Sequence, residues 1–260
     1  MSDVTDVAIE ANAQLLWDAW AGGGLLENLP ATPEPANLAD AYRVQFAMDR
    51  FAGARVGWKL AATGAGGRTA LGVEQPLAGP LYERFQVSKG GSVDFAPIRM
   101  RTIEAEFGLQ LGRNLPPTGA PYDHETIRDA IAAFLPAIEI PNTRYLDHRS
   151  VGAVALTSDA ACAGLFVLGE ARSTFDPSSL PEHRVTLHTP NGTVEGTGAK
   201  VLGDPVEAVR WLANELAAHG YGLNAGEYVI TGAAAATRDP GVGRVVAEFG
   251  PLGQVELELS

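Results

Sequence analysis

The segment 101–113, RTIEAEFGLQLGR, alternates apolar and polar residues with a period of two, which is the pattern of a β-strand with one buried face. The apolar side of this segment consists of Ile103, Ala105, Phe107, Leu109 and Leu111. The other side carries Glu104 and Glu106, with Gly108 next in line. Two like charges on one strand face indicate either a solvated outer face or a cation held between the carboxylates.

Short strands of this kind dominate the chain after Arg55. A strand is expected in RVGWKLAATG, which starts at Arg55 and runs into a glycine-rich turn. The further expected strands are 101–111, 135–141, 164–169, 183–189, 193–201, 227–231, 244–249 and 254–259. The sequence Pro190-Asn191-Gly192 predicts a hairpin turn, and the 30 Gly and 17 Pro are typical of a chain with many turns.

Helices are predicted mainly at the N-terminus. Apolar spacing predicts one over 4–20, ended by Gly22–Gly24, and a second that is capped by Asn37 and reaches Phe51. Two later helices are expected, from Asp123 through Phe134 and from Asp204 to His219. We therefore expect an α+β protein with a helical N-terminal arm over 1–52 and a strand-rich catalytic domain over 53–260.

The acidic composition excludes several classes of partner. A formal net charge of −12 argues against a nucleic-acid surface and against an anionic membrane surface, although it leaves an anionic small substrate open. The single cysteine, Cys162, permits neither a disulfide within the chain nor a Cys-rich zinc site. The N-terminus lacks a basic secretory region and no apolar run is long enough to span a membrane, so a cytoplasmic protein is expected.

A third carboxylate lies in an apolar setting. Glu139 in FLPAIEIPNTRY is flanked by Ile138 and Ile140, and a buried carboxylate needs a cation or another partner. With Glu104 and Glu106 it would complete an oxygen site for a divalent cation. The alternative is a salt bridge, for which Arg144 is the nearest candidate in sequence, or simple exposure.

Among the other reactive side chains, Lys59 is the only charged residue from Val56 to Gly67. It either extends to solvent or binds a carboxylate and exchanges protons. Cys162 is expected to be a small buried apolar residue and not a nucleophile. His148 follows Glu139 by nine positions and could approach a site there, while the GAGG run at 64–67 lacks the residues of a phosphate-binding loop.

An ordered set of short motifs resembles the 2-keto-4-pentenoate hydratase family of the fumarylacetoacetase superfamily. The motifs are Ala41-Tyr42-x-x-Gln45, Gly57-x-Lys59, Leu71-Gly72-Val73-x-Gln75-Pro76, Glu104-x-Glu106, Pro136-Ala137-x-Glu139-Ile140, 164–169, 211–214 and Thr231-Gly232. Each motif is weak alone, but the order is specific and covers the chain from about residue 38 to its end.

The resemblance implies a mixed β-sheet roll and one Mg²⁺ or Mn²⁺ held by Glu104, Glu106 and Glu139. It implies that the ion takes the oxygens of a small 2-oxo acid or its enol and polarises them as a Lewis acid. Lys59 corresponds to the family lysine that binds the substrate carboxylate and transfers protons. The remaining implied positions are Glu74 as a proton shuttle and Leu71, Cys162 and Thr231 as substrate contacts. A homo-oligomer is also implied, to which Trp17 and Trp20 of the first helix would contribute contact area.

The chain departs from the family pattern at Trp58, at Glu74 and at 160–163, where Ala-Ala-Cys-Ala replaces Asn-Ala-Ser-Ser. The C–C hydrolases of the superfamily resemble one another in activating water with an acid-paired histidine in the N-terminal or lid region. This chain has no histidine before His124, so C–C hydrolysis ranks below hydration and decarboxylation as a hypothesis. The leading hypothesis is a metal-dependent hydratase of an unsaturated 2-oxo acid, as in the meta-cleavage degradation of aromatic compounds. The alternatives are a decarboxylase of the 4-oxalocrotonate type or a tautomerase with the same metal site, and a non-catalytic relative with a changed pocket.

Overall fold

The computed structural model describes residues 4–28 and 33–260. The helices are α1 (Asp6–Gly22), α2 (Leu38–Ala52), α3 (Ala65–Leu71), α4 (His124–Ala130), α5 (Gly152–Ser158) and α6 (Pro205–Ala218). The strands are β1 (Arg55–Ala61), β2 (Leu77–Tyr82), β3 (Ser92–Val93), β4 (Thr102–Leu111), β5 (Ile131–Ile140), β6 (Leu165–Leu168), β7 (Arg184–Thr189), β8 (Gly192–Thr197), β9 (Tyr228–Arg238), β10 (Gly243–Glu248) and β11 (Gln254–Leu259).

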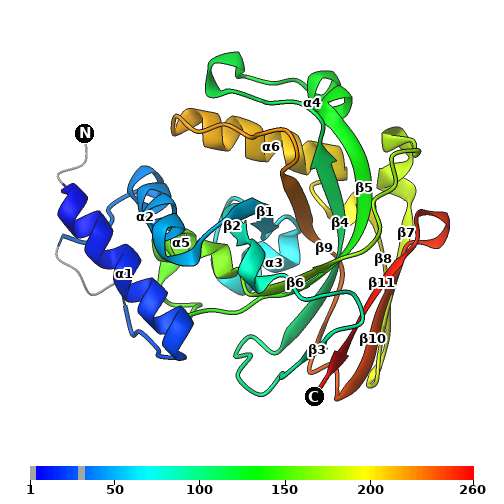
Figure 1. Cartoon of the computed structure of the whole chain (residues 1–260), viewed down its shortest axis with the longest axis horizontal. Helices are drawn as coiled ribbons and strands as arrows, with labels where there is room; N and C mark the ends of the chain where they lie inside the picture. Colours follow the sequence, from blue (N-terminus) through cyan, green and yellow to red (C-terminus); the bar gives the residue numbers. More distant parts are fainter. Residues whose placement is uncertain (1–3, 29–32) are drawn as a thin grey trace.

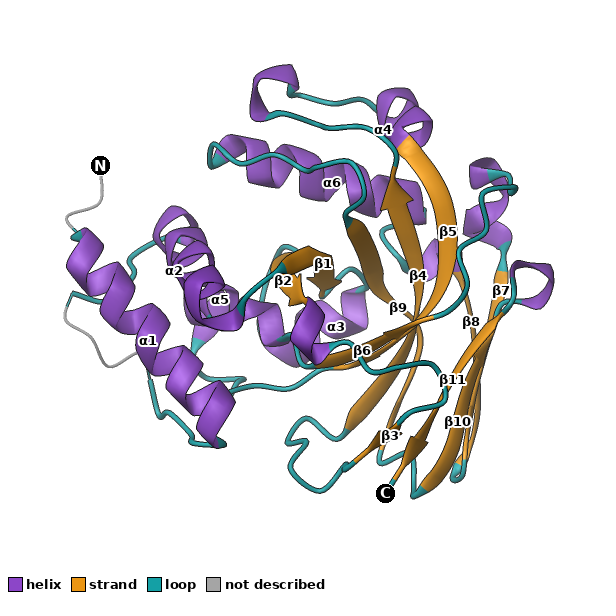
Figure 2. Cartoon of the chain, viewed as in Figure 1, coloured by secondary structure: helices purple, strands orange, loops and turns teal. Residues whose placement is uncertain are grey.

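The strands form two sheets that pack against each other (Figure 2). One has six strands in the order β2-β1-β9-β4-β5-β6, and the other has five in the order β3-β11-β10-β7-β8. Pairing is mostly antiparallel, but β1 runs parallel to β9 and β3 runs parallel to β11. The predicted α+β class with mixed sheets is therefore confirmed.

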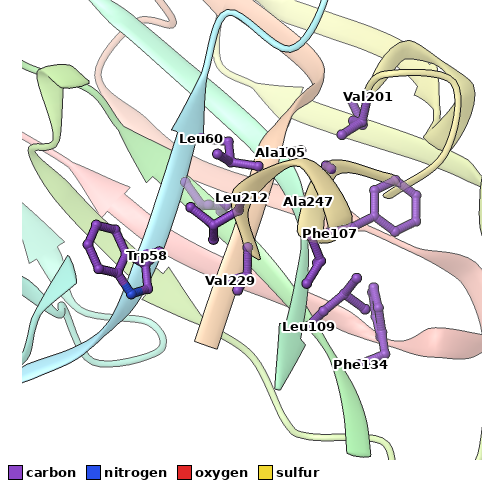
Figure 3. Close-up of a cluster of buried hydrophobic side chains, with 14 of the residues drawn as sticks. Trp58, Leu60, Ala105, Phe107, Leu109, Phe134, Val201, Leu212, Val229 and Ala247 are labelled. Atoms are coloured by element: carbon purple, nitrogen blue, oxygen red, sulfur yellow. The ribbon is translucent and has the colours of Figure 1, made fainter. Parts of the chain in front are cut away.

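The main core fills the space between the two sheets and α6. The apolar side of β4 supplies Ile103, Ala105, Phe107 and Leu109, each with none of its surface exposed. Figure 3 shows Phe107 and Leu109 in one cluster with Phe134 of β5 and Leu212 of α6. The alternation that predicted a buried strand face is thus confirmed, and β4 and β5 are held in place from that face.

The N-terminal helices lie together at the end of the molecule away from the five-stranded sheet (Figure 1). The predicted Asn37 cap forms, because its side-chain oxygen accepts the Asp40 N–H at 3.0 Å. Trp20 stacks on Phe85 of the same chain, with ring centroids 4.5 Å apart, and Trp17 lies beside both rings. Both Trp side chains therefore pack within the subunit. The predicted arm of 1–52 includes residues 1–3 and 29–32, which lie outside the described residues, and its boundary stays a prediction.

Several predicted boundaries were wrong. The helix expected from Asp123 through Phe134 ends at Ala130, because β5 already begins at Ile131 and pairs with β4. The strand expected at 227–231 continues to Arg238, and that expected at 193–201 ends at Thr197. The glycine-rich turn after β1 is the start of α3. The elements α5, β2 and β3 were not predicted.

No helix among residues 4–28 and 33–260 is both long enough and apolar enough to cross a membrane.

Candidate metal centre

The two glutamates of β4 occupy the strand face opposite the core. Glu106 has none of its surface exposed, and Glu104, nearer the strand start, is half-buried. The β4–β9 pairing is irregular on both sides of Glu106, which leaves Gly232 of β9 out of register. Its N–H donates to Glu106 Oε2 at 2.6 Å. A bulge here re-aims one backbone group towards a side chain, as bulges beside functional sites commonly do.

Gly232 is suited to this position for two reasons. Its φ of +99° lies in the region that favours glycine. A Cβ atom there would also lie 2.1 Å from Thr63 Oγ1. A larger residue would therefore shift the N–H away from Glu106.

The register of β5 brings the third carboxylate to the other two. Glu139 stands directly opposite Glu104 in the antiparallel pair, so both side chains point to the same face. Carboxylate oxygens from Glu104, Glu106 and Glu139 all lie within 4.8 Å of one another. The structure thus brings together the three glutamates that the sequence marked as a cation site.

The hydrogen bonding of these carboxylates is incomplete. Glu106 Oε1 and both oxygens of Glu139 are buried and lack a hydrogen-bond partner among the described residues. Burial raises the pKa of Glu106 well above its usual value, and the charges of Glu139 and Glu104 raise it further. Burial also raises the pKa of Glu139, to about 7. Three converging carboxylates with orphaned oxygens fit a hard divalent cation, which would satisfy these oxygens and offset the repulsion.

A buried cationic side chain borders the triad. Lys59 of β1 is 1% exposed, and its Nζ lies 2.9 Å from Glu139 Oε1. This contact is an ion pair, whereas the hydrogen bond of Nζ is donated to the Ala161 carbonyl oxygen at 3.0 Å. Burial alone lowers the pKa of Lys59, but the charges of Glu139 and Glu106 outweigh burial and raise it. Lys59 is therefore an ammonium at neutral pH.

A cavity of about 300 Å³ opens over this centre. Lys59 and Glu104 line it, together with the predicted substrate contacts Leu71 and Cys162. Burial raises the pKa of the Cys162 thiol to about 12, which agrees with an apolar role. The cavity is thus apolar along Leu71 and Cys162 and charged where Lys59 and Glu104 meet it.

Two predicted site residues lie elsewhere. Glu74 is exposed and lines a different cavity beside Trp211, and its role as a proton shuttle stays a prediction. Thr231 does not line the 300 Å³ cavity, because its hydroxyl is buried and donates to the Phe107 carbonyl oxygen at 3.0 Å. This segment instead contributes to the metal centre through the Gly232 N–H, which donates to Glu106. Arg144, weighed as a partner of Glu139, pairs with Asp159.

The cavity also contains charged residues that the sequence did not point to. Arg149 and Arg238 line it, as does His148, whose approach to the site was predicted. Burial lowers the pKa of His148, and the charges of Arg149 and Arg238 lower it further. Neither arginine has a carboxylate partner within 4.0 Å in the part of the chain that the structure describes. Only the sheet register shows that Arg238 belongs to the site, because it places Arg238 opposite Thr102, on the face that carries Glu104.

No protein-family model matches the chain, but individual relatives do. A 2-keto-4-pentenoate hydratase from Paraburkholderia xenovorans is 31% identical over 231 residues, which cover 86% of this chain and 84% of the relative. A 4-oxalocrotonate decarboxylase from Pseudomonas putida is also 31% identical, over 84% of both chains. Sequence identity therefore places the chain equally near a hydratase and a decarboxylase.

A solved structure matches the whole fold. The 4-oxalocrotonate decarboxylase from Pseudomonas putida G7, complexed with magnesium and adipate, superposes with a TM-score of 0.89 at 25% identity and 100% coverage of both chains. The fold is shared more widely with the fumarylacetoacetate hydrolase family, which confirms the predicted architecture. On the sequence identity and coverage of its relatives, the chain belongs to the 2-keto-4-pentenoate hydratase family.

Proposed function

We propose that this chain is a divalent-metal-dependent lyase that acts on a small 2-oxo acid, with addition of water to an unsaturated 2-oxo acid as its leading reaction. The observation that carries the proposal is the set of three converging glutamates with orphaned buried oxygens beside the ammonium of Lys59. The 31% identity to 2-keto-4-pentenoate hydratases and the magnesium in the related decarboxylase structure support it.

Glu104, Glu106 and Glu139 would hold one Mg²⁺ or Mn²⁺. Bound there, the ion supplies Lewis-acid polarisation of the oxygen atoms of a 2-oxo acid. Lys59 reaches the same cavity as a cation, forms an ion pair with Glu139 and donates one N–H group to the Ala161 carbonyl oxygen. The N–H groups not used on Ala161 suit a substrate carboxylate, and the raised pKa makes Lys59 a proton donor and not a base.

Leu71, Cys162 and neighbouring alanines form the apolar part of the cavity wall, against which the unsaturated carbon chain would lie. This wall excludes water from most of the substrate, so water must enter from the exposed end. His148, at the same cavity, is half-buried with a lowered pKa and is therefore a neutral imidazole at pH 7. It replaces Glu74 as the side chain best placed to exchange a proton with the far part of the substrate.

The reaction is tested with 2-hydroxypenta-2,4-dienoate in the presence of Mg²⁺ or Mn²⁺. We expect hydration by the wild-type chain, loss of turnover in EDTA, and loss of both turnover and metal affinity in Glu106→Gln. Glu74→Gln, in the other cavity, is the matched control and should retain both. Turnover and metal affinity that survive Glu106→Gln would contradict the assignment.

A second reaction is favoured by the two arginines of the cavity. In the regular part of the β4–β9 ladder, Thr102 faces Arg238 and Glu104 faces Ala236. Arg238 therefore points to the face of the triad, about 7 Å farther towards solvent along the strand. Guanidinium groups without a carboxylate partner among the described residues, in a chain of net charge −12, indicate a site for a second carboxylate. A 2-oxo diacid, decarboxylated at this centre, is the substrate class that such an arrangement suits.

Two ligands of equal length separate the two reactions. With Mn²⁺ present, 2-oxoadipate and 2-oxohexanoate differ only in the terminal carboxylate, and calorimetry compares their affinities. Tighter binding of the diacid, lost in Arg238→Gln while the monoacid is unaffected, would favour the diacid reaction. Release of CO₂ from 4-oxalocrotonate would establish it. Equal affinity for both acids, together with hydration of the dienoate, would support the hydratase reaction and exclude the diacid reaction.

A further inference from the structure

We propose that the buried Arg144–Asp159 pair positions Lys59, by fixing the loop whose Ala161 carbonyl oxygen holds the ammonium. The inference rests on the proposed function, because it takes Lys59 as the group that binds the substrate carboxylate. Arg144 and Asp159 do not line the cavity themselves, so their role would be exerted through the backbone of the loop.

The loop has an unusual backbone. Ala160, Ala161 and Cys162 have φ values of +52°, +50° and +61°, which place three consecutive non-glycine residues in the left-handed region. An L-residue is disfavoured there because its Cβ atom approaches the following carbonyl oxygen. Such strain persists only where the surrounding contacts over-determine the conformation, and it gathers at functional sites. Contacts with Arg144 and Gly79 hold this loop, and its conformation directs the Ala161 carbonyl oxygen towards Lys59.

Arg144 holds the loop at both ends. Its Nε donates to Asp159 Oδ1, one terminal nitrogen donates to the Asp159 carbonyl oxygen, and the other donates to the Ala163 carbonyl oxygen at 2.6 Å. Thr143 Oγ1 and the Arg144 N–H bind the second oxygen of Asp159, at 2.9 and 3.1 Å. Arg144 is 3% exposed and Asp159 is fully buried, so these charges compensate each other away from water.

Close packing fixes the middle of the loop. Gly79 of β2 lies so near that a Cβ atom on it would be 1.8 Å from the Ala160 carbonyl oxygen. With the preceding carbonyl seated against Gly79, the Ala161 carbonyl oxygen faces Lys59 Nζ. The contacts therefore run from Arg144 through the loop backbone to Lys59, and from Lys59 to Glu139 of the triad.

The arrangement gives the N-terminal helix a connection to the site. The Arg144 guanidinium lies 3.9 Å from the ring centroid of Trp20 in α1, a cation–π geometry. Trp20 in turn stacks on Phe85. The apolar side of α1 thereby covers the guanidinium and keeps the Arg144–Asp159 pair away from solvent.

The test compares two affinities in two variants. Arg144→Lys keeps the charge but loses the planar fork, and Ala161→Gly keeps the carbonyl group, relieves the strain at that residue and lets the loop adopt other conformations. Calorimetry measures Mn²⁺ binding first and then oxalate binding to the Mn²⁺-loaded chain. We expect Mn²⁺ affinity within about twofold of wild type, and oxalate affinity lower by about 10- to 100-fold, since misplacement of one group by 1 Å can cost that much.

Thermal unfolding separates positioning from a purely structural role. Arg144→Lys should lower the melting temperature, whereas Ala161→Gly should leave it unchanged or raise it and still weaken oxalate binding. Arg244→Lys, which alters an exposed pair with Glu256 in the other sheet, is the control and should change neither affinity. If Arg144→Lys fails to fold, Ala161→Gly alone decides the question.

Oxalate affinity equal to wild type in Ala161→Gly, or a parallel loss of Mn²⁺ and oxalate affinity in Arg144→Lys, would overturn the positioning role alone. Absence of oxalate binding in the Mn²⁺-loaded wild-type chain would overturn the proposed function, and the positioning role with it.

Discussion

Both faces of β4 are buried near the middle of the strand, but they are stabilised in different ways. On one face, Ile103, Ala105 and Phe107 pack into the main core with no exposed surface. On the other, Glu106 is equally buried, yet one of its oxygens has no partner in the described residues and two further carboxylates approach it. The first face stabilises the strand, whereas the second costs free energy until a cation arrives.

The magnitudes explain why the strand tolerates the second face. Full burial of a large apolar side chain contributes about 1.5–3 kcal/mol, and β4 carries several of them. An unsatisfied buried polar group costs roughly 1–3 kcal/mol, and a charged one costs more. The apolar face can therefore hold Glu104, Glu106 and Glu139 in a repulsive arrangement. Substitutions on the two faces should therefore change the free energy of unfolding in opposite directions.

The largest effect is expected on the apolar face. Phe107 contacts Phe134 and Phe249 edge-on, with ring centroids 5.9 and 5.3 Å apart. Phe107→Ala should lower the free energy of unfolding by about 3–5 kcal/mol, through lost burial and the cavity left behind. Urea denaturation of the metal-free chain measures it. A loss below about 1 kcal/mol would mean that this face does not hold the strand.

The opposite sign is expected on the carboxylate face. In metal-free protein at pH 7.5, Glu106→Gln removes a buried carboxyl group whose ionisation is disfavoured and keeps an oxygen for the Gly232 N–H, so it should raise the free energy of unfolding by roughly 1–3 kcal/mol. Excess Mn²⁺ should reverse the order, because only the wild type gains stability from the ion. Destabilisation of the metal-free chain by Glu106→Gln would contradict the comparison.

A smaller effect is expected when the stability and the Mn²⁺ affinity of the chain are measured as a function of pH. The pKa of Glu139 is raised to about 7 and that of Glu106 is raised as well, so the folded metal-free chain binds more protons than the unfolded chain. Its stability should therefore fall as pH rises from about 4.5 to 7. The Mn²⁺ association constant should rise over the same window, about tenfold per pH unit for each proton displaced. Calorimetry at several pH values detects the rise, and a flat profile from pH 5 to 7 would argue against these carboxylates as ligands.

The smallest effect is expected at Glu74. This side chain is exposed and lies outside the cavity of the triad, so Glu74→Gln should change the free energy of unfolding by less than about 0.5 kcal/mol. Turnover should also be unchanged. A loss of turnover larger than tenfold would instead support Glu74 as a proton shuttle, and a kinetic comparison with wild type decides it.

The sequence predicted what depends on local pattern. The alternation in 101–111 and the caps at Asn37 and Asp204 were confirmed, because strand periodicity and helix capping are local properties. The helix expected through Phe134 failed because residues from Ile131 gain pairing with β4. The helix α3 was missed because glycines open it.

The site was predictable only in part. Glu104, Glu106 and Glu139 could be marked from burial pattern and resemblance, but their approach within 4.8 Å depends on the register of β4 with β5. The Gly232 N–H and the Ala161 carbonyl oxygen belong to the backbone, so no side chain in the sequence indicates their contribution to the site. Arg238 joins the cavity through a strand that was expected to end seven residues earlier.

The most direct test of the account is anomalous diffraction from crystals grown with Mn²⁺. We expect one strong anomalous peak per chain, within coordination distance of carboxylate oxygens from Glu104, Glu106 and Glu139. The peak should vanish in crystals of Glu106→Gln. A peak elsewhere in the molecule, or no peak at the triad at neutral pH, would contradict the claim that this face of β4 is a divalent-metal centre.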